Sequence, residues 1–550
     1  MLASKTLRQI AVIIVVINCG GAILQAQTKT SRAIKVNNQQ EARSDQDDLI
    51  AQGAAALQRG EPEVARKLFE QALKSNPNNS SAHNYLGILD DGAGDLKNAE
   101  IHFAKAARLD PKSASMRNNY GAILLKLNRA REAAIEFEAS LRLDPKRLNA
   151  LVNLAQIRFN ENTSNALQAS FALFERAAAL APDSAVERSL VVIALRLKNK
   201  AAARAHYQTY ATLIAAQTNL PNAADRAALG GALYEADLLA EAEAELKAAL
   251  AAEPSNAGTI VLLGRVYLAR GDVKSAGVLL ETAVARKQAT AAVYSLLAVV
   301  YEKVGRYENA IPAMRLAINL QPESENYRFQ YGMLLANTDA PAAAVIRLDE
   351  ALKIFPGSPR LWLVHGIAYL KDNKNAEAVK SINKALELDP KFAQAHAYLG
   401  LVKLQTGEYS EAVKSYEKAL ANDADLVIVH QLIAEAMLQQ SDLDSARIEA
   451  EAKKSIALAP DFTPAYLTLG TLYVRLQRWA EAAAVLKEVV RREPETAEAY
   501  YQLGRVYARL KLKDESAASL KKFKELSESQ KARSDSELRE VVRRLADVRF

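Results

Sequence analysis

The chain has 550 residues, half of them apolar and only 6% aromatic, and it is too long for one compact hydrophobic core. Its 71 basic and 64 acidic residues are mixed along most of the sequence, so the net charge of +7 does not form the concentrated basic face that binds nucleic acid. Abundant alanine and the scarcity of period-two alternation favour an all-helical protein.

The N-terminus has the pattern of a secretory signal peptide. Two basic residues precede an aliphatic run at residues 10–17, and small residues follow up to Ala26. We expect cleavage after Ala26 and export to the periplasm or cell envelope of a bacterium. An inner-membrane anchor formed by uncleaved residues 9–26 is an alternative, and so is lipidation at Cys19. Cleavage would leave no cysteine, which suits an oxidising compartment.

A small residue recurs along most of the chain at a nearly constant interval. Residues 27–45 are polar and unpatterned, so we expect a linker there. From residue 46 the interval is mostly 34 residues, and the series is Gly53, Gly87, Gly121, Ala155, Val192, Gly230, Gly264, Ala298, Gly332, Gly366, Gly400, Ala434, Gly470 and Gly504. A fixed period of this length predicts a solenoid of repeated helix pairs.

Other positions of each repeat are also restricted, when the small residue is numbered position 8. Positions 4, 7, 8 and 11 share one face of the first helix. Position 24 is bulky, and position 32 is proline in ten repeats and should end the second helix. Position 20 is a second small residue, which lets two helices approach closely: Ala65, Ala99, Ala133, Ala242, Ala276, Ala310, Ala344, Ala378, Ala412, Ala446 and Ala482.

This spacing resembles the tetratricopeptide repeat, with its pattern W-x2-L-G-x2-Y, then A-x3-F, then P. The resemblance covers residues 46–530 as fourteen units. It implies a right-handed superhelical α-solenoid of paired antiparallel helices that binds proteins or peptides on its concave face. We divide it into an N-terminal array (46–184), a degenerate repeat (185–222) and a C-terminal array (223–530). The degenerate repeat is either tolerated drift or a softer joint.

The last twenty residues, 531–550, predict a capping helix. A capping box spans Ser534 to Glu537, and apolar residues follow on one helical face. Such a helix would seal the exposed apolar side of the last repeat. Binding of this basic segment to a membrane surface is an alternative.

The sequence contains no recognisable catalytic or metal-binding motif. Walker, GxGxxG, GxSxG and HExxH patterns are absent, and the DDGAGD segment lacks the final acidic ligand of a calcium loop. His83, His396 and His430 all fall at position 4, which we interpret as a packing position. O-GlcNAc transferases carry similar arrays beside a catalytic domain, but here repeats occupy essentially the whole of the expected mature chain. We therefore expect no enzyme activity, no cofactor and no small-molecule substrate.

Positions 2, 5, 9 and 12 should line the concave groove, because they lie opposite the buried stripe. In repeats two to four they are rich in amides, which can pair with any peptide backbone. Two further asparagines at position 6 resemble the asparagine ladder of O-GlcNAc transferase arrays. Solvated amides are the alternative interpretation. The predicted peptide-binding residues here are Asn84, Asn118, Asn119, Asn149, Asn153 and Gln156.

In repeats seven to thirteen the same positions are apolar. They either pack against neighbouring inner helices or receive an apolar partner segment, and we hypothesise the second. On that hypothesis, lysine at Leu363, Ile367 and Leu401 should abolish partner capture without unfolding. The full set is Val261, Val299, Phe329, Met333, Leu363, Ile367, Leu401, Leu404, Leu438, Leu467 and Val474.

The sequence thus predicts an exported, non-enzymatic scaffold that binds peptide or protein segments in its concave groove. An accessory factor in envelope export, for polysaccharide secretion or outer-membrane assembly, is the first alternative. An accessory subunit of a glycosyltransferase system is the second.

Overall fold

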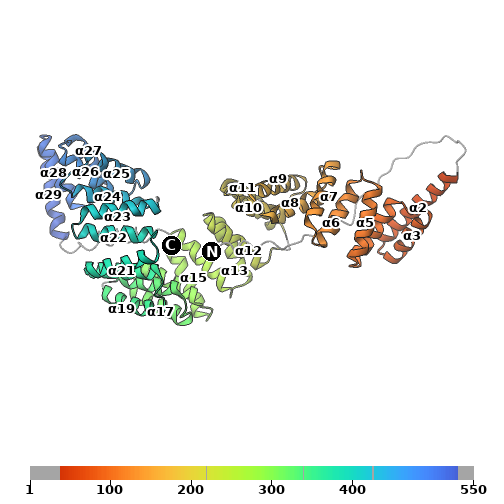
Figure 1. The fold of residues 1–550 in the computed structure, drawn as a ribbon, viewed down its shortest axis with the longest axis horizontal. Helices are drawn as coiled ribbons and strands as arrows, with labels where there is room; N and C mark the ends of the chain where they lie inside the picture. The colour runs from red at the N-terminus through yellow and green to blue at the C-terminus, as the bar shows by residue number, and fades with distance from the viewer. Residues whose placement is uncertain (1–37, 218–219, 339, 424–425, 531–550) are drawn as a thin grey trace. The chain divides into compact units, whose positions relative to one another are not determined.

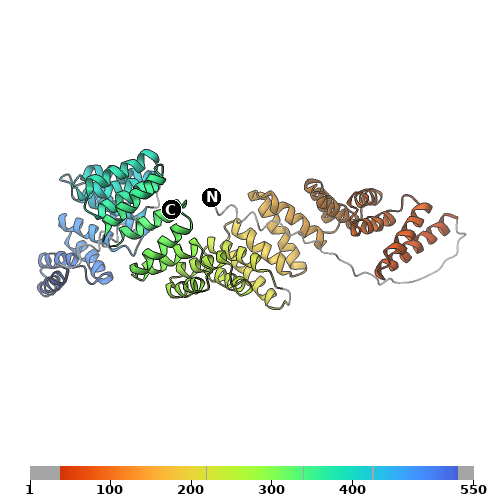
Figure 2. The same ribbon diagram turned by 90° about the horizontal axis from the view of Figure 1, so that it is seen from below.

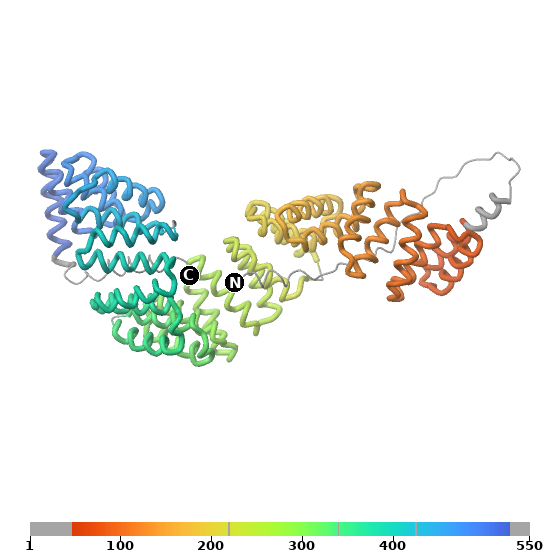
Figure 3. The backbone as a smooth tube through the Cα atoms, in the orientation of Figure 1, coloured from red at the N-terminus to blue at the C-terminus, as the bar shows by residue number. Residues whose placement is uncertain are grey.

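The computed structural model describes residues 38–217, 220–338, 340–423 and 426–530, and within these ranges it describes side chains from residue 47 to residue 527. All its regular elements in these ranges are α-helices, and none of them is a strand (Figure 1). The chain runs back and forth through consecutive helices joined by short loops (Figure 3). The all-α class predicted from composition is confirmed.

Each repeat contributes a first helix, A, and a second helix, B. The A helices are α2 (Asn38–Gln58), α4 (Ser80–Gly92), α6 (Ala114–Lys126), α8 (Leu148–Glu161), α10 (Ser184–Arg196), α12 (Ala223–Glu235), α14 (Ala257–Ala269), α16 (Ala291–Lys303), α18 (Glu325–Ala336), α20 (Pro359–Lys371), α22 (Ala393–Gln405), α24 (Val427–Leu438), α26 (Thr463–Arg475) and α28 (Ala497–Arg509). The B helices are α3 (Pro62–Ser75), α5 (Leu96–Leu109), α7 (Ala130–Leu143), α9 (Ser164–Leu180), α11 (Lys200–Ala215), α13 (Leu239–Ala252), α15 (Val273–Ala285), α17 (Tyr307–Leu320), α19 (Pro341–Ile354), α21 (Asn375–Leu388), α23 (Tyr409–Asn422), α25 (Ser445–Leu458), α27 (Trp479–Arg492) and α29 (Lys513–Gln530).

The chain divides into two compact units, one ending at Asp272 and the other beginning at Val273. Within each unit, A and B helices pack as pairs and each pair stacks on the next (Figure 2). Sequence analysis instead divided the array at residues 185–222. That degenerate repeat forms an ordinary pair, α10 and α11, because its apolar residues, Val192 among them, are buried.

Glycine at position 8 is required by a side chain of the facing B helix. A Cβ atom added to Gly121 would lie 2.9 Å from the ring of Phe137, and one added to Gly87 would lie 2.8 Å from Phe103. Both rings occupy position 24 of the same repeat. Positions 8 and 24 are therefore one contact, in which the bulky residue fills the space that glycine leaves. The same pairing holds for Gly53, Gly230, Gly332, Gly366, Gly400, Gly470 and Gly504.

In several repeats, position 4 carries a hydrogen-bond donor for the end of the preceding repeat. Its side chain reaches the carbonyl of the proline six residues earlier, which would otherwise be an unpaired acceptor at a helix end. This contact pairs Trp362 with Pro356 at 2.9 Å, and Tyr466 with Pro460, His83 with Pro77 and His396 with Pro390, each at 3.0 Å. The histidines predicted to be packing residues are buried, and two of them have this polar role as well.

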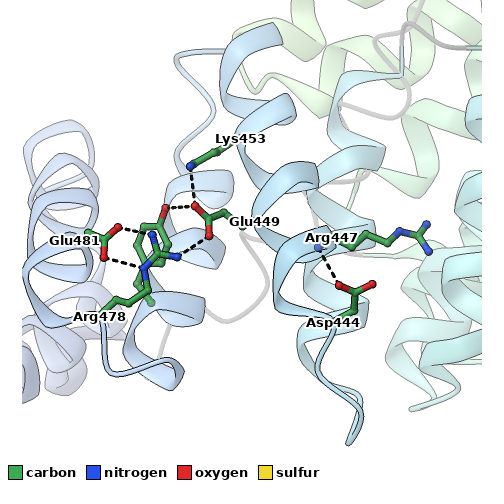
Figure 4. Close-up of polar contacts among 7 residues, drawn as sticks. Asp444, Arg447, Glu449, Lys453, Arg478 and Glu481 are labelled. Carbon is green, nitrogen blue, oxygen red and sulfur yellow. Dashed lines mark hydrogen bonds and ion pairs between the residues drawn. The ribbon is translucent and has the colours of Figure 1, made fainter.

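Charged side chains join consecutive B helices at the two ends of the array. Glu449 of α25 accepts hydrogen bonds from Lys453 at 2.6 Å, Arg478 at 2.6 Å and Tyr473 at 2.9 Å (Figure 4). Arg478, the residue before α27, also donates to Glu481 at 2.7 Å. The hydrogen bonds from Lys453 and Arg478 lower the pKa of Glu449 to about 2.

The same arrangement recurs between α5 and α7. Arg129 donates to Glu132 of its own repeat at 2.7 Å and to Glu100 of the preceding repeat at 2.5 Å. In both places the arginine is at position 16 and one acid is at position 19. The other acid, Glu100, is at position 21, and Glu449 is its equivalent after a loop that is two residues longer. We call each such set an arginine bracket, since it couples two neighbouring repeats.

Two sequence predictions about local structure are wrong. The expected linker at residues 27–45 ends early, because α2 begins at Asn38 and the good helix formers after it contain no proline or glycine before Gly53. Ala446 is exposed and is not the small contact residue of its repeat. A longer loop before α25 shifts the register by two, so that Ile448 is buried at that position.

Several predictions concern segments outside the described residues. The signal peptide with its cut at Ala26, the anchor at residues 9–26 and the capping helix at 531–550 all lie there. Between Asn38 and Gln530, no helix that the structure describes is both long and apolar enough to cross a membrane.

Candidate binding surface on the A helices

The face of each A helix that points away from its B helix is called the inner face here. Consecutive A helices contact one another within each compact unit, for example α4 with α6 and α24 with α26. Residues at positions 2, 5, 6 and 9 of successive repeats are thereby brought side by side. A partner segment lying across several A helices would meet these residues in sequence.

The inner face of α4 and α6 carries a hydrogen-bonded row of amides. Asn119 Nδ2 donates to Asn84 Oδ1 at 2.9 Å, and Asn118 Nδ2 donates to Asn119 Oδ1 at 3.4 Å. We call Asn84, Asn118 and Asn119 the amide row. Asn84 and Asn118 occupy position 5 of adjacent repeats, and Asn119 at position 6 makes the hydrogen bond that joins the two repeats.

The amide row has unused hydrogen-bonding capacity at both of its ends. At one end, no hydrogen bond within the described chain uses the Nδ2 group of Asn84. At the other end, Asn118 is 6% exposed and its Oδ1 atom has no donor among the described residues. The row therefore offers a donor at α4 and an acceptor at α6, which is what a peptide unit requires.

The other three predicted amides lie on the next A helix, α8. Asn149, Asn153 and Gln156 are half-buried there, and Gln156 Nε2 donates to Asn160 at 3.1 Å. No hydrogen bond between described residues joins them to the amide row. They extend the polar inner face by one repeat without continuing the row itself.

The apolar inner-face residues of repeats seven to thirteen are not the open groove that the sequence suggested. Leu363, Ile367 and Leu401 are 0%, 2% and 4% exposed and belong to one hydrophobic core cluster. Three other residues of the predicted groove are also buried: Val261, Phe329 and Leu438. The remaining five are half-buried: Val299, Met333, Leu404, Leu467 and Val474.

The physical reason is the close packing of neighbouring A helices. Pairs such as α18 with α20 and α22 with α24 contact each other directly, so their inner leucines fill the space between repeats. The expectation that lysine at Leu363, Ile367 and Leu401 spares the fold is therefore wrong, because a buried unpaired ammonium group is strongly destabilising.

Sequence reasoning missed one exposed apolar residue on the inner face. Ile88 of α4 is 41% exposed and lies one turn after Asn84, at position 9. The sequence analysis assigned position 9 to the groove, so the residue at position 9 of the second repeat was the signal that identifies Ile88. Asn84 and Ile88 together give α4 a polar and an apolar contact for a partner.

A serine, a histidine and an aspartate meet at α19–α21, but they do not form a catalytic site. Ser381 Oγ lies 3.2 Å from His365 Nδ1, and His365 Nε2 lies 3.4 Å from Asp349. The hydroxyl also donates to the Glu377 carbonyl at 3.0 Å, and Ser381 is 4% exposed. A hydroxyl that is covered and bonded to its own helix cannot attack a substrate. No metal-binding cluster of histidine, cysteine and acidic residues occurs in the described ranges.

Comparison with known families identifies the repeat. Models described as tetratricopeptide repeat match residues 50–114, 114–147, 233–300, 291–324, 363–427 and 467–530, which together make up more than half of the chain. The chain belongs to the tetratricopeptide repeat family. A tetratricopeptide repeat array implies a scaffold for protein interactions, and all the family models that match are of this repeat. A search of curated proteins returned no match.

Several solved structures are similar to part or most of the chain. The anaphase-promoting complex hetero-tetramer Cut9–Hcn1 is 14% identical with a TM-score of 0.39, over 89% of this chain and 95% of that one. Naa15/Naa10 bound to HypK-THB is 14% identical with a TM-score of 0.33, over 92% and 100%. YrrB, titled a tetratricopeptide repeat protein with an unusual peptide-binding site, is 24% identical with a TM-score of 0.27, over 32% and 90%.

Proposed function

We propose that this protein is a non-enzymatic scaffold that binds an extended peptide segment of a partner protein along the inner face of α4, α6 and α8. The observation that carries the proposal is the amide row, with a free donor group at Asn84 and a buried acceptor without a donor at Asn118. A peptide backbone can fill both, whatever its side chains.

The energetic argument concerns the acceptor of Asn118. An unpaired acceptor that is buried costs about 1–3 kcal/mol relative to a paired one. A bound backbone N–H group would remove that cost, after a small turn of the side chain outward. Ile88 would supply apolar contact beside it, since it is the exposed neighbour of Asn84 on α4.

Export to the bacterial cell envelope is part of the proposal, and its support is the sequence of residues 1–26. A basic start, an aliphatic run and a small residue at Ala26 are the features that signal peptidases recognise. Fractionation of cells followed by N-terminal sequencing tests this. The proposal predicts a mature protein that begins at Gln27 in the envelope fraction, and a cytoplasmic protein with an intact N-terminus would contradict it.

The binding proposal is tested with peptides selected from a random display library on the full chain. The variant N84A/N118A/N119A removes the amide row. Since each neutral hydrogen bond contributes about 0.5–1.5 kcal/mol, the loss should weaken the selected peptides roughly tenfold or more. Affinity is measured by fluorescence anisotropy with labelled peptides.

The matched control is N309A/N383A, which removes two exposed asparagines from the B helices α17 and α21. It should leave the affinity unchanged. Equal weakening by both variants, or no weakening by the triple variant, would show that the amide row is not the binding site. Circular dichroism of each variant establishes that the helices remain folded.

A further inference from the structure

Two histidines of the second repeat face each other between α4 and α5. His83 Nδ1 lies 2.9 Å from His102 Nδ1, and His83 Nε2 lies 3.0 Å from the carbonyl oxygen of Pro77. On its far side, His102 Nε2 lies 3.8 Å from Asp90 Oδ2. Arg66 of α3 binds the other oxygen of Asp90 at 2.8 Å. His83 and Asp90 are each 5% exposed, so this row runs through the interior of the repeat.

The neighbours of each ring nitrogen determine where the protons lie. A carbonyl oxygen only accepts, so His83 carries its proton on Nε2 and its Nδ1 is a bare acceptor. His102 must then donate from Nδ1, which leaves its Nε2 bare in the neutral ring. That bare nitrogen faces the carboxylate of Asp90.

The folded arrangement of His83, His102 and Asp90 can take up one added proton but not two. A proton on His102 Nε2 points at the Asp90 carboxylate and turns an acceptor–acceptor contact into a favourable one. A further proton on His83 Nδ1 would place two N–H groups against each other at the 2.9 Å separation of the ring nitrogens. The His83–His102 contact must break to admit it.

We propose that His83 and His102 form a proton sensor that admits a single added proton, so that mild acid loosens the second repeat. The unfolded chain can protonate both rings, whereas the folded repeat can protonate only one. In acid, the open state of α3–α5 therefore binds one proton more than the folded state. The equilibrium shifts toward the open state as the pH falls.

The net effect of the surroundings is in the same direction. Burial is the largest effect and lowers the pKa of both imidazoles below the usual 6.5. The hydrogen bond to the Pro77 carbonyl raises the pKa of His83, whereas Lys105 of α5 lowers the pKa of both rings. Arg66 of α3 also lowers the pKa of His102, while Asp90 of α4 and Glu70 of α3 raise it. A histidine with a lowered pKa stabilises the folded state fully above pH 6.5, and this contribution is lost as the pH falls below that value.

The consequence for binding rests on the proposed function. His83 precedes Asn84 of the amide row on α4, so opening of the second repeat would separate Asn84 from Asn119. A partner held by the amide row would then be released as the pH falls. The sensor itself does not depend on any partner.

Hydrogen exchange of the full chain, without any peptide, tests the sensor. Protection is compared between pH 6.5 and 5.5 in α3–α5, after correction for the intrinsic exchange rate. One excluded proton predicts a fall in protection of roughly fivefold for this step, because the ring in the unfolded chain is half protonated at pH 6.5 and almost fully protonated at pH 5.5. The variant H83Q/H102Q should lose this pH dependence. If that variant does not fold, H102Q alone is used, since its amide can still donate to His83.

His396 provides a matched control, because it occupies the same position of another repeat and has the same contact to a proline carbonyl at 3.0 Å. In H396Q, α3–α5 should keep the full pH dependence. The sensor would be overturned if protection fell as much in H83Q/H102Q as in the wild type, or if it did not fall in the wild type. Because no ligand is present, a failure here is distinct from a failure of the amide row to bind peptides.

Discussion

At the scale of single residues, the contact between positions 8 and 24 determines how closely the two helices of a repeat approach. Phe137 is completely buried and its ring occupies the space above Gly121. The ring cannot move aside without disturbing the next repeat. Size at position 8 is therefore limited by a neighbour sixteen residues away, and not by the backbone conformation of the glycine.

Gly121→Ala should destabilise the third repeat. Alanine improves helix propensity by up to about 1 kcal/mol, but forcing a methyl group to 2.9 Å from the Phe137 ring costs about 1–3 kcal/mol. The net effect should appear as faster hydrogen exchange in α6 and α7. Methionine at position 137 in the same chain should restore protection, because the eighth repeat combines alanine at position 8, Ala298, with methionine at position 24, Met314.

Gly92→Ala is the comparison, since nothing lies within 4 Å of a Cβ atom added there. Its exchange should be unchanged or slower. If Gly121→Ala is as harmless as Gly92→Ala, the close contact does not explain the recurring glycine.

The sequence predicted the spacing of these residues but not their partners. Periodicity identified positions 8, 20, 24 and 32 as helix contacts, because side chains that touch across repeats cannot vary freely. It did not reveal that the side chain at position 4 donates a hydrogen bond to a proline carbonyl. Tryptophan, tyrosine and histidine can all donate this bond, but they differ in size and shape and so do not stand out as one residue class. A shared donor group was the signal available.

At the scale of helices, the arginine brackets couple one repeat to the next. Glu449→Gln should loosen α26 and α27 against α25, because it removes the charge that Arg478 and Lys453 share. The pKa of Glu449 is lowered to about 2, so its stabilising contribution is complete above pH 4.5 and is lost as the pH falls toward 2. The variant should lack that acid-dependent change.

Hydrogen exchange in α25–α27 between pH 4.5 and 3 is the measurement for the bracket. Glu411→Gln is the control, because Glu411 pairs with Lys414 inside the single helix α23 at 2.7 Å. Exposed pairs within one helix contribute little. If both variants have the same effect on local exchange, the bracket does not couple repeats.

Packing between A helices is where the interpretation of the sequence failed. Helical periodicity within one repeat shows which residues share a face, but not how near the next A helix comes. Leu363 and Asn84 both occupy position 5, yet the first is completely buried and the second is half-buried. The amide residues could be placed correctly because the 34-residue spacing aligns them whatever the distance between helices.

At the scale of the molecule, stability should be a sum of local terms, because each repeat contacts mainly its neighbours. The last described helix, α29, has an exposed apolar residue at a packing position. Leu520 occupies position 24 and is 41% exposed, whereas Phe69 and Phe137 at the same position are completely buried. Residues 531–550 lie outside the described residues, and their predicted role is to cover this face.

Truncation after Gln530 should therefore loosen α28 and α29 and leave distant repeats unchanged. Serine at Leu538, Val541 and Leu545 should have the same effect as truncation, since the apolar side chains would make the contact. Glutamine at Arg539, Arg543 and Arg544 should have little effect on hydrogen exchange in α28 and α29. If the glutamine substitutions loosened α28 and α29 more than the serine substitutions did, the result would favour the membrane-surface role of this segment.

The central claim is that a partner segment lies on the inner face at the amide row. Site-specific photo-crosslinking in intact cells tests it most directly, with the photoreactive residue at Ile88 on the inner face of α4 or at Ile101, which is 55% exposed on α5. The account predicts a crosslinked protein from position 88 that is absent from position 101 and lost in the N84A/N118A/N119A background. Equal crosslinking from both positions, or a product that persists without the amide row, would contradict it.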